Sequence, residues 1–273
     1  MTPHWNAKDI NFIRNTDVHE LIFDKLPGDV TPHTRKTVLK LVRRVLQMAV
    51  DDQVLVVNPC TGISVKAPIN DQKVLNRLEV NKLLTEARRT NHYFYNVWIM
   101  ALYSGLRSGE LFALLWSDID LENRIVHVNK SWSSKNGLKD TKSGRSRVVP
   151  ISDELLKFLK EQRLMAGTSV HVLPRLHEWQ RGGQAKVLRD FCKRIAITPI
   201  RFHDLRATFI TNLLAQGVPL AVVMAIVGHN QIETTNEYLR KAGVEIKGAT
   251  DRLGYEIPNP ESGQVVPLKI MYS

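Results

Sequence analysis

A histidine and a tyrosine stand close together in the stretch GHNQIETTNEYL, residues 228–239. His229 follows an apolar, helix-like run, and Tyr238 comes nine residues later. One interpretation is a loop followed by a helix whose Tyr238 is half buried. The other is that both side chains act on one phosphate group. Short motifs often match by chance, so the rest of the chain has to decide between the two.

Arg107 lies near two glycines in SGLRSGELFAL, residues 104–114, where a helix is expected to begin. Exposed backbone N–H groups and a guanidinium at such a point can bind an anion. Glu110 follows three residues later and can hold an arginine through a salt bridge. The alternative is an ordinary turn between two helices with a surface arginine.

A lysine and an arginine lie in DTKSGRSRVVP, residues 140–150. Lys142 stands beside a Ser-Gly turn, and a lysine on a hairpin can reach into a DNA groove. The alternative is that Lys142 is an ordinary surface residue of the turn that only makes the protein more soluble. We assign Arg147, in the same stretch, to DNA binding.

His203 and Arg206 lie in RFHDLRATFITNLLAQG, residues 201–217. Residues three apart on a helix share one face, so these two side chains can share a phosphate. A zinc site is disfavoured, because the segment lacks a second ligand four residues after the histidine.

Taken in order, the motifs GLRSGEL, TKSGRSRVVP, HDLR, GH and Y resemble those of the tyrosine recombinase or phage integrase family, over essentially the whole chain. The resemblance implies a site-specific DNA recombinase with no substitution at its catalytic positions. Glu110 matches an acidic position that supports the first arginine. The implied catalytic residues are Arg107, Lys142, His203, Arg206, His229 and Tyr238.

The implied reaction is attack by Tyr238 on a DNA phosphodiester, which gives a 3′-phosphotyrosine and a free 5′-hydroxyl without ATP. Because a tyrosine pKa is ordinarily near 10, the attack needs a base, for which His203 is the candidate. The two arginines stabilise the charged phosphate, His229 donates a hydrogen bond, and Lys142 protonates the leaving oxygen. No acidic cluster suited to Mg²⁺ accompanies these groups, so we expect no metal and no other cofactor.

The composition agrees with a DNA-binding role. The formal net charge is +11, from 38 Lys+Arg and 27 Asp+Glu, which favours nucleic acid first and an anionic membrane surface second. Cys60 and Cys192 have no metal-ligand spacing, the N-terminus has no signal core, and no apolar run could span a bilayer. We therefore expect a cytoplasmic, nucleoid-associated protein with reduced thiols and no membrane contact.

The clearest helix lies within residues 31–59, with Thr31 as its N-cap and Pro32 at its first position. One apolar stripe is expected to be buried: Val38, Leu41, Val42, Val45, Leu46 and Ala49. Candidates for contact with the DNA backbone fall mostly off this stripe: Arg35, Lys36, Lys40, Arg43 and Arg44. A merely solvated charged face is the open alternative.

The rest of the chain is mostly helical in pattern. Helices are expected at 76–90, 93–104, 108–115, 183–194, 203–216, 219–227 and 232–241, and from Ser152 onward. Residues 124–130 alternate like a strand, and 133–151 indicate a hairpin with turns at Asn136-Gly137 and Ser143-Gly144.

The expected fold class is mainly α (α+β), similar to DNA-breaking-rejoining enzymes. We expect a SAM-like helical core-binding DNA-binding domain at 1–67 and a linker at 68–75. A mixed catalytic domain with a small antiparallel sheet is expected at 76–257, and a tail at 258–273. Many integrases of mobile elements begin with an extra arm-binding domain, and we expect either that this protein never had one or that the N-terminus is incomplete.

The family resemblance also implies partners. These are double-stranded DNA recombination sites, three further copies of the chain in a DNA-bound homotetramer formed from free monomers, and a candidate accessory directionality factor. Integration and excision of a mobile element is the expected role. The segment after Tyr238 docks either on a neighbouring copy or on its own domain. Two alternatives stay open: a type IB topoisomerase-like strand transferase, and a catalytically inactive sequence-specific DNA-binding protein.

Overall fold

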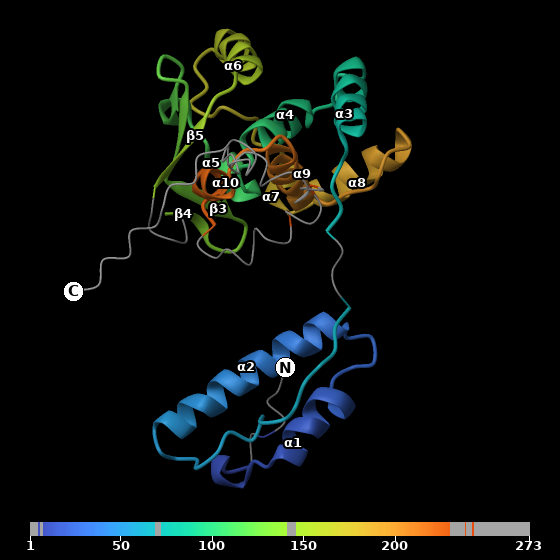
Figure 1. The fold of residues 1–273 in the computed structure, drawn as a ribbon, viewed down its shortest axis with the longest axis vertical. Helices are drawn as coiled ribbons and strands as arrows, with labels where there is room; N and C mark the ends of the chain where they lie inside the picture. Colours follow the sequence, from blue (N-terminus) through green and yellow to red (C-terminus); the bar gives the residue numbers. More distant parts are fainter. Residues whose placement is uncertain are drawn as a thin grey trace, which may run out of the picture. The chain divides into compact units, whose positions relative to one another are not determined.

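The computed structural model describes residues 5, 8–68, 72–140, 146–229, 238 and 242. The chain divides into two compact units, residues 1–71 and 72–273, each with its own core (Figure 1). Within the described residues, no helix has both the length and the apolar character needed to cross a membrane.

The smaller unit is built around one long helix. Its elements are η1 (Ile10–Phe12), α1 (Asn15–Glu20), η2 (Leu21–Lys25) and α2 (Pro32–Asp51). The Thr31 hydroxyl accepts a hydrogen bond from the Thr34 N–H at 3.3 Å, and Pro32 occupies the first helical turn. The predicted start of this helix is therefore confirmed.

The predicted buried stripe of α2 is partly wrong. Leu41 and Val45 are each 60% exposed, whereas Leu39, which the stripe left out, is buried with Leu46. The helix carries apolar residues over a wide arc, and the short elements around it cover only part of that arc. The face that packs against η2 and its neighbours is thus rotated from the predicted one.

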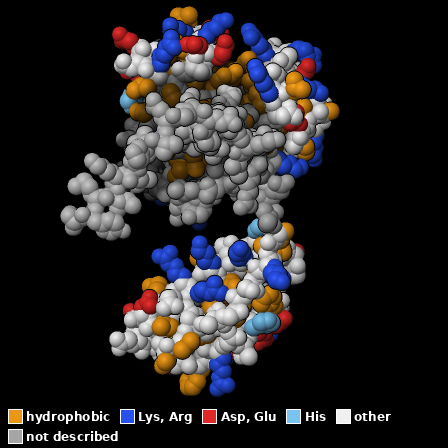
Figure 2. Space-filling model, in the orientation of Figure 1, with side chains coloured by type: hydrophobic (Ala, Val, Ile, Leu, Met, Phe, Trp, Pro, Cys, Tyr) orange, Lys and Arg blue, Asp and Glu red, His pale blue; other side chains and the backbone are white. Residues whose placement is uncertain are grey.

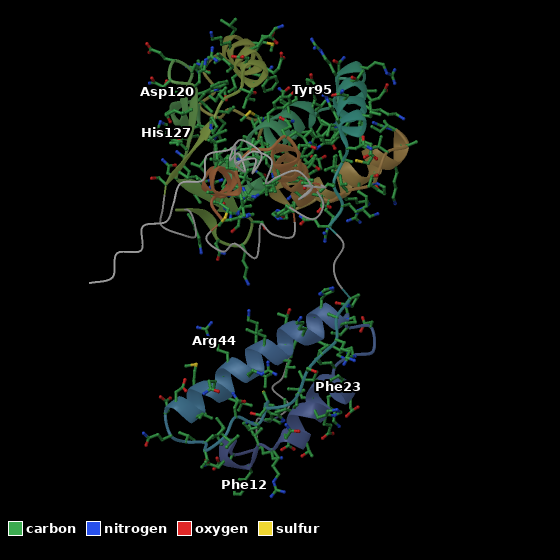
Figure 3. All side chains as sticks on the ribbon, viewed as in Figure 1. Phe12, Phe23, Arg44, Tyr95, Asp120 and His127 are labelled. Carbon is green, nitrogen blue, oxygen red and sulfur yellow. The ribbon has the colours of Figure 1, made fainter. Side chains whose placement is uncertain are left out.

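The described residues of the larger unit form two small antiparallel sheets. One has the order β1 (Ile119–Asp120), β2 (Ile125–Val128), β5 (Arg147–Pro150), and the other pairs β3 (Lys130–Ser133) with β4 (Gly137–Asp140). Val126 lies opposite Val149, both fully buried, while His127 points outward (Figure 3). The turn at Asn136-Gly137 is confirmed, with Gly137 at φ 67°; the turn at Ser143-Gly144 lies outside the described residues.

Eight α-helices lie among the described residues of the larger unit. In chain order they are α3 (Arg77–Arg89), α4 (Tyr95–Ser104), α5 (Ser108–Ala113), α6 (Asp153–Met165), α7 (His177–Gln180), α8 (Gln184–Arg194), α9 (Phe202–Ala215) and α10 (Leu220–Val227). All except the short α7 were predicted. Of the helix expected at 232–241, only residue 238 is described, and it is helical. The mainly α fold with small antiparallel sheets is confirmed.

The almost wholly buried α4 is central to the larger unit, and α9 packs beside it (Figure 1). The C-terminal end of α4 and the N-terminal half of α9 contribute backbone and side-chain groups to the candidate active site.

Candidate active site

The turn between α4 and α5 depends on a glycine. Gly105 ends α4 in the left-handed region, at φ 61°, and a Cβ there would lie 2.3 Å from the Phe209 ring. Conformation and space therefore both require glycine. The Gly105 carbonyl accepts a hydrogen bond from Arg206 Nη1 at 2.6 Å, so this turn is joined directly to α9.

The next turn places Arg107 at the start of α5. Its backbone N–H donates to Glu110 Oε2 at 2.8 Å, and its Nη1 donates to Glu110 Oε1 at 2.9 Å. The predicted salt bridge is present. The Arg107 side chain is 45% exposed, so part of the guanidinium faces solvent.

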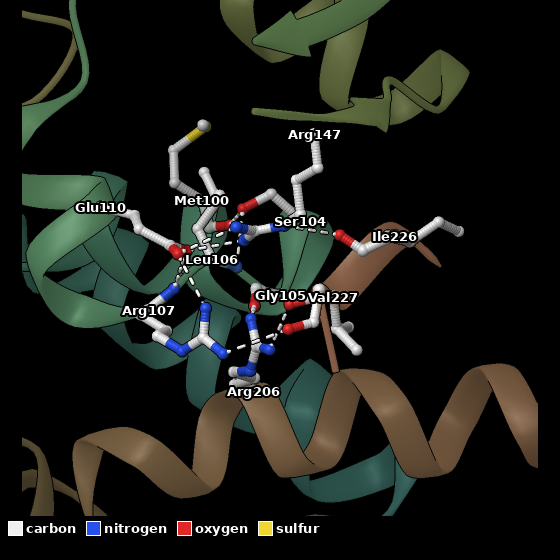
Figure 4. A network of polar contacts seen from close by, with 11 residues as sticks. Met100, Ser104, Gly105, Leu106, Arg107, Glu110, Arg147, Arg206, Ile226 and Val227 are labelled. Carbon is white, nitrogen blue, oxygen red and sulfur yellow. Dashed lines mark hydrogen bonds and ion pairs between the residues drawn. The ribbon is translucent and has the colours of Figure 1, made fainter. Parts of the chain in front are cut away.

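Glu110 is shared with a second arginine, Arg147 of β5 (Figure 4). Arg147 donates from Nη1 to Oε1 at 2.9 Å and from Nη2 to Oε2 at 2.7 Å. Burial would raise the pKa of Glu110, but hydrogen bonding and charge from Arg147, and then from Arg107, outweigh it and lower the pKa to about 2. Glu110 is therefore a carboxylate throughout the physiological range.

Arg206 is the most deeply placed charge of the site, at 2% exposed. Besides Gly105, it donates from Nη2 to the Val227 carbonyl at 2.5 Å, which ties α9 to the end of α10. Burial, and then the charge of Arg107, lower its pKa to about 9. It is still cationic near pH 7.

Helix α10 ends at Gly228, which has a left-handed backbone at φ 69°, and His229 follows it. The backbone N–H of His229 donates to the Met224 carbonyl. Burial, then the charges of Arg206 and Arg107, lower its pKa to about 4. Burial and Arg206 also lower the pKa of His203. Both imidazoles are thus favoured as neutral groups at pH 7, when each has one N–H donor and one acceptor nitrogen.

Tyr238 lies beside His229, with ring centroids 6.3 Å apart and ring planes 24° from parallel. It is 5% exposed, in a cluster with residues of α9 and α10 that include Ala207 and Val227. A tyrosinate at this position would act electrostatically on Arg206, which places the phenol in the field of that arginine.

The structure therefore brings together, around the supporting Glu110, five candidate catalytic residues: Arg107, His203, Arg206, His229 and Tyr238. Such a set of two cations, neutral imidazoles and a phenol can bind a phosphate and exchange protons with it. Lys142 lies outside the described residues.

Arg147 has a place that the sequence reasoning missed. It was assigned to DNA binding, yet its side chain is only 11% exposed and its donors are turned to Glu110 and the Ile226 carbonyl. Strand alternation could have indicated the burial of Arg147, though not its partners, because side chains two apart share a face. Arg147 shares its face with the buried Val149, whereas Val148 is 50% exposed.

The basic residues of α2 fall into two groups. Arg35 donates to the carbonyls of Ile22 and Pro27, at 2.5 and 3.0 Å. Arg43 donates to the Ile63 carbonyl at 2.6 Å. Both guanidiniums thus hold the unit together.

The other three, Lys36, Lys40 and Arg44, are exposed, and their side chains make no hydrogen bond or ion pair within the described part of the chain. Arg44 projects from α2 on the side away from α1 (Figure 3). Figure 2 shows Lys and Arg side chains gathered on one side of the smaller unit. This side offers unpaired cations to a polyanion.

Comparison with known proteins gives a consistent result. A family model described as the phage integrase family matches residues 73–244. The chain is 28% identical over 243 residues to a tyrosine recombinase XerC-like protein of Caldanaerobacter subterraneus, covering 74% of this chain and 60% of that protein. It therefore spans less than two thirds of that relative's length.

Two solved structures share the fold. The Tn1549 transposon integrase in complex with a circular intermediate DNA matches with a TM-score of 0.76 at 17% identity, covering 89% of this chain and 86% of that one. A lambda integrase tetramer bound to a Holliday junction matches with a TM-score of 0.62 at 14% identity, covering 86% and 67%.

Proposed function

The chain belongs to the phage integrase family, and from that membership and the site geometry we propose that it is a site-specific DNA recombinase. It would cleave and rejoin DNA through a 3′-phosphotyrosine, without ATP and without a metal cofactor. One observation carries the proposal: Arg206, buried at 2% exposure, lies within one electrostatic cluster with Arg107, His229 and Tyr238.

In the proposed first step, Tyr238 Oη attacks the phosphorus and the bond from phosphorus to the 5′-oxygen breaks. The phenol proton passes to His203, whose lowered pKa keeps an acceptor nitrogen available at pH 7. The leaving 5′-oxygen takes a proton from Lys142. Reversal with a second 5′-hydroxyl rejoins the strand, so the energy of the phosphodiester is conserved in the covalent link.

The arginines would stabilise the charge that builds on the non-bridging oxygens. Arg206 is held by two carbonyls and Arg107 by Glu110, so neither has to be reoriented as charge develops. His229 would add a neutral N–H donor. A fixed, partly desolvated set of donors is what an anionic transition state needs.

DNA would be bound through both units, with residues 1–67 as a core-binding domain and 76–257 as the catalytic domain. Lys36, Lys40 and Arg44 support contact of the first domain with phosphates, because they are exposed and unpaired. A tetramer on paired sites is proposed from the tetrameric state of the lambda integrase match. Integration or excision of a mobile element, a directionality factor and location on the nucleoid belong to the same proposal.

Covalent trapping tests the proposal. The chain is incubated in EDTA with nicked duplexes from which the short 5′ fragment diffuses away, next to a Tyr238→Phe variant. We expect a denaturation-resistant adduct with the wild type and none with the variant. DNA binding without an adduct would instead favour the inactive DNA-binding alternative, and relaxation of supercoiled DNA without exchange would favour the topoisomerase-like one.

A further inference from the structure

Arg147 is an arginine whose polar atoms are already engaged inside the protein. Its Nε donates to the Ile226 carbonyl at 2.9 Å, and both terminal nitrogens donate to Glu110. Its side chain is 11% exposed, against 45% for Arg107. A phosphate can therefore reach Arg107, whereas Arg147 would first have to give up its internal partners.

The backbone of Arg147 is also fixed. The residue is the first of β5, and it lies opposite Val128 in the antiparallel ladder with β2. Its guanidinium consequently joins three elements: β5, the start of α5 through Glu110, and the end of α10 through Ile226. A Cβ on Gly228 would lie 3.0 Å from Arg147 Cδ, so the arginine also packs against the turn that carries His229.

The sharing of Glu110 has a chemical consequence. Each carboxylate oxygen has two lone-pair sites, and Arg147 takes one on each oxygen in a two-pronged pair. Arg107 then makes one side-chain bond to the carboxylate, from Nη1. Without Arg147, the exposed Arg107 could turn a second donor to the buried carboxylate and away from a bound phosphate.

We propose that Arg147 is a positioning residue that holds Glu110 and the Gly228 turn, and so presents Arg107 and His229 to the scissile phosphate. The proposal rests on the recombinase function proposed above. Arg147 does not touch the DNA, and its role is transmitted through the two groups that it supports.

The test uses the full chain with three variants: Arg147→Met, Arg147→Lys and, as a control, Arg124→Met. Arg124 lies in an exposed ion pair with Asp153. Thermal unfolding shows which variants fold. Affinity and its salt dependence are measured on a target duplex, and the single-turnover cleavage rate is measured on a nicked duplex at saturating protein.

We expect cleavage by Arg147→Met to slow about 10²-fold, as for a displaced catalytic group, with affinity within about twofold of the wild type. Arg147→Lys, which keeps the charge but cannot make the two-pronged pair, should be slowed nearly as much. If Arg147→Met fails to fold, the cleavage rate of Arg147→Lys tests the proposal in its place. Glu110→Gln combined with either variant should be no slower than the slower single change, because the two residues act as one unit.

An unchanged cleavage rate at saturation, with weaker binding and a salt slope reduced by about 0.9, would show instead that Arg147 is a phosphate contact. Losses that multiply in the double variant would also overturn the proposal. If the wild type itself forms no adduct, the recombinase function fails separately. In that case the side-chain ¹⁵N–¹H NMR signal of Arg107 tests whether Arg147 positions it. The signal should shift and broaden in Arg147→Lys and stay unchanged in Arg124→Met.

Discussion

Cationic side chains occur in two kinds of surroundings in this chain. Those on α2 are exposed to solvent, whereas those in the site formed by α5, α9 and α10 are mostly enclosed. On α2, Lys36, Lys40 and Arg44 face solvent without partners in the described structure. In the site, Arg206 and Arg147 are almost wholly enclosed by carbonyls and one carboxylate. Exposed charges act through a screened field that tolerates small displacements, whereas enclosed charges act at fixed positions.

The difference predicts how each region responds to substitution. Changes on α2 should alter DNA affinity and its salt dependence, with little effect on folding. Changes in the site should alter the cleavage rate and the free energy of unfolding together, because each guanidinium there also satisfies buried backbone or carboxylate oxygens.

The largest effect is expected from Arg206→Ala. It removes a charge from the proposed phosphate site and leaves the Gly105 and Val227 carbonyls without their donor. We expect cleavage at saturating protein to fall about 10³-fold and the melting temperature to drop. Arg189→Ala, on the exposed surface of α8, is the control. A cleavage rate within tenfold of wild type would remove Arg206 from the chemistry.

Much of this site could be predicted from the sequence because its pairs are local. Arg107 with Glu110, and His203 with Arg206, are three apart at the starts of helices, and helix geometry alone places them together. The starts of α2 and α6 follow from the capping residues Thr31 and Ser152 for the same reason.

The parts that local spacing does not provide depend on contacts across long stretches of chain. Arg147 meets Glu110 across 37 residues of sequence, and no local spacing reports such a pair. The buried face of α2 depends on where η2 packs, because apolar residues occupy more of the helix than its neighbours cover. Leu41 and Val45 were therefore placed in the core by periodicity although they are exposed.

The second-largest effect is expected from Glu110→Gln, which leaves Arg147 buried without an anion. Breaking a buried ion pair from one side costs about 3 kcal/mol of unfolding free energy, and the loss of order at Arg107 should slow cleavage as well. Urea unfolding and single-turnover cleavage measure the two losses. Asp153→Asn removes the anion of an exposed pair and should cost less than about 1 kcal/mol. Equal losses in the two variants would contradict the distinction between enclosed and exposed charges.

A smaller effect is expected from pH. His229 has a folded pKa of about 4 against the ordinary 6.5. Between these values the unfolded chain binds a proton at His229 that the folded chain does not, so the free energy of unfolding should fall as pH drops from about 6.5 to 4. Glu110, with a folded pKa of about 2 against 4.5, adds a further loss as pH falls from about 4.5 toward 2.

Urea unfolding at several pH values measures this dependence. His229→Asn keeps a polar side chain but has no imidazole to titrate, so it should flatten the upper part of the curve and leave the part below pH 4 unchanged. A wild-type curve that is level from pH 6.5 to pH 4 would show that His229 is not held in the field of the arginines.

The smallest effect on the protein itself is expected on α2. Combined replacement of Lys36, Lys40 and Arg44 by alanine should leave the melting temperature unchanged and reduce the salt slope of DNA binding by about 2 to 3, since each lost phosphate contact removes about 0.9. Arg35→Ala, on the same helix, should do the reverse, because its guanidinium holds the Ile22 and Pro27 carbonyls. Lys160→Ala, at an exposed position of α6, shows the effect of removing one positive charge elsewhere. If the change in slope depended only on how many charges were removed, so that Arg35→Ala and Lys160→Ala each gave one third of the change seen in the triple variant, overall charge rather than this face of α2 would govern binding.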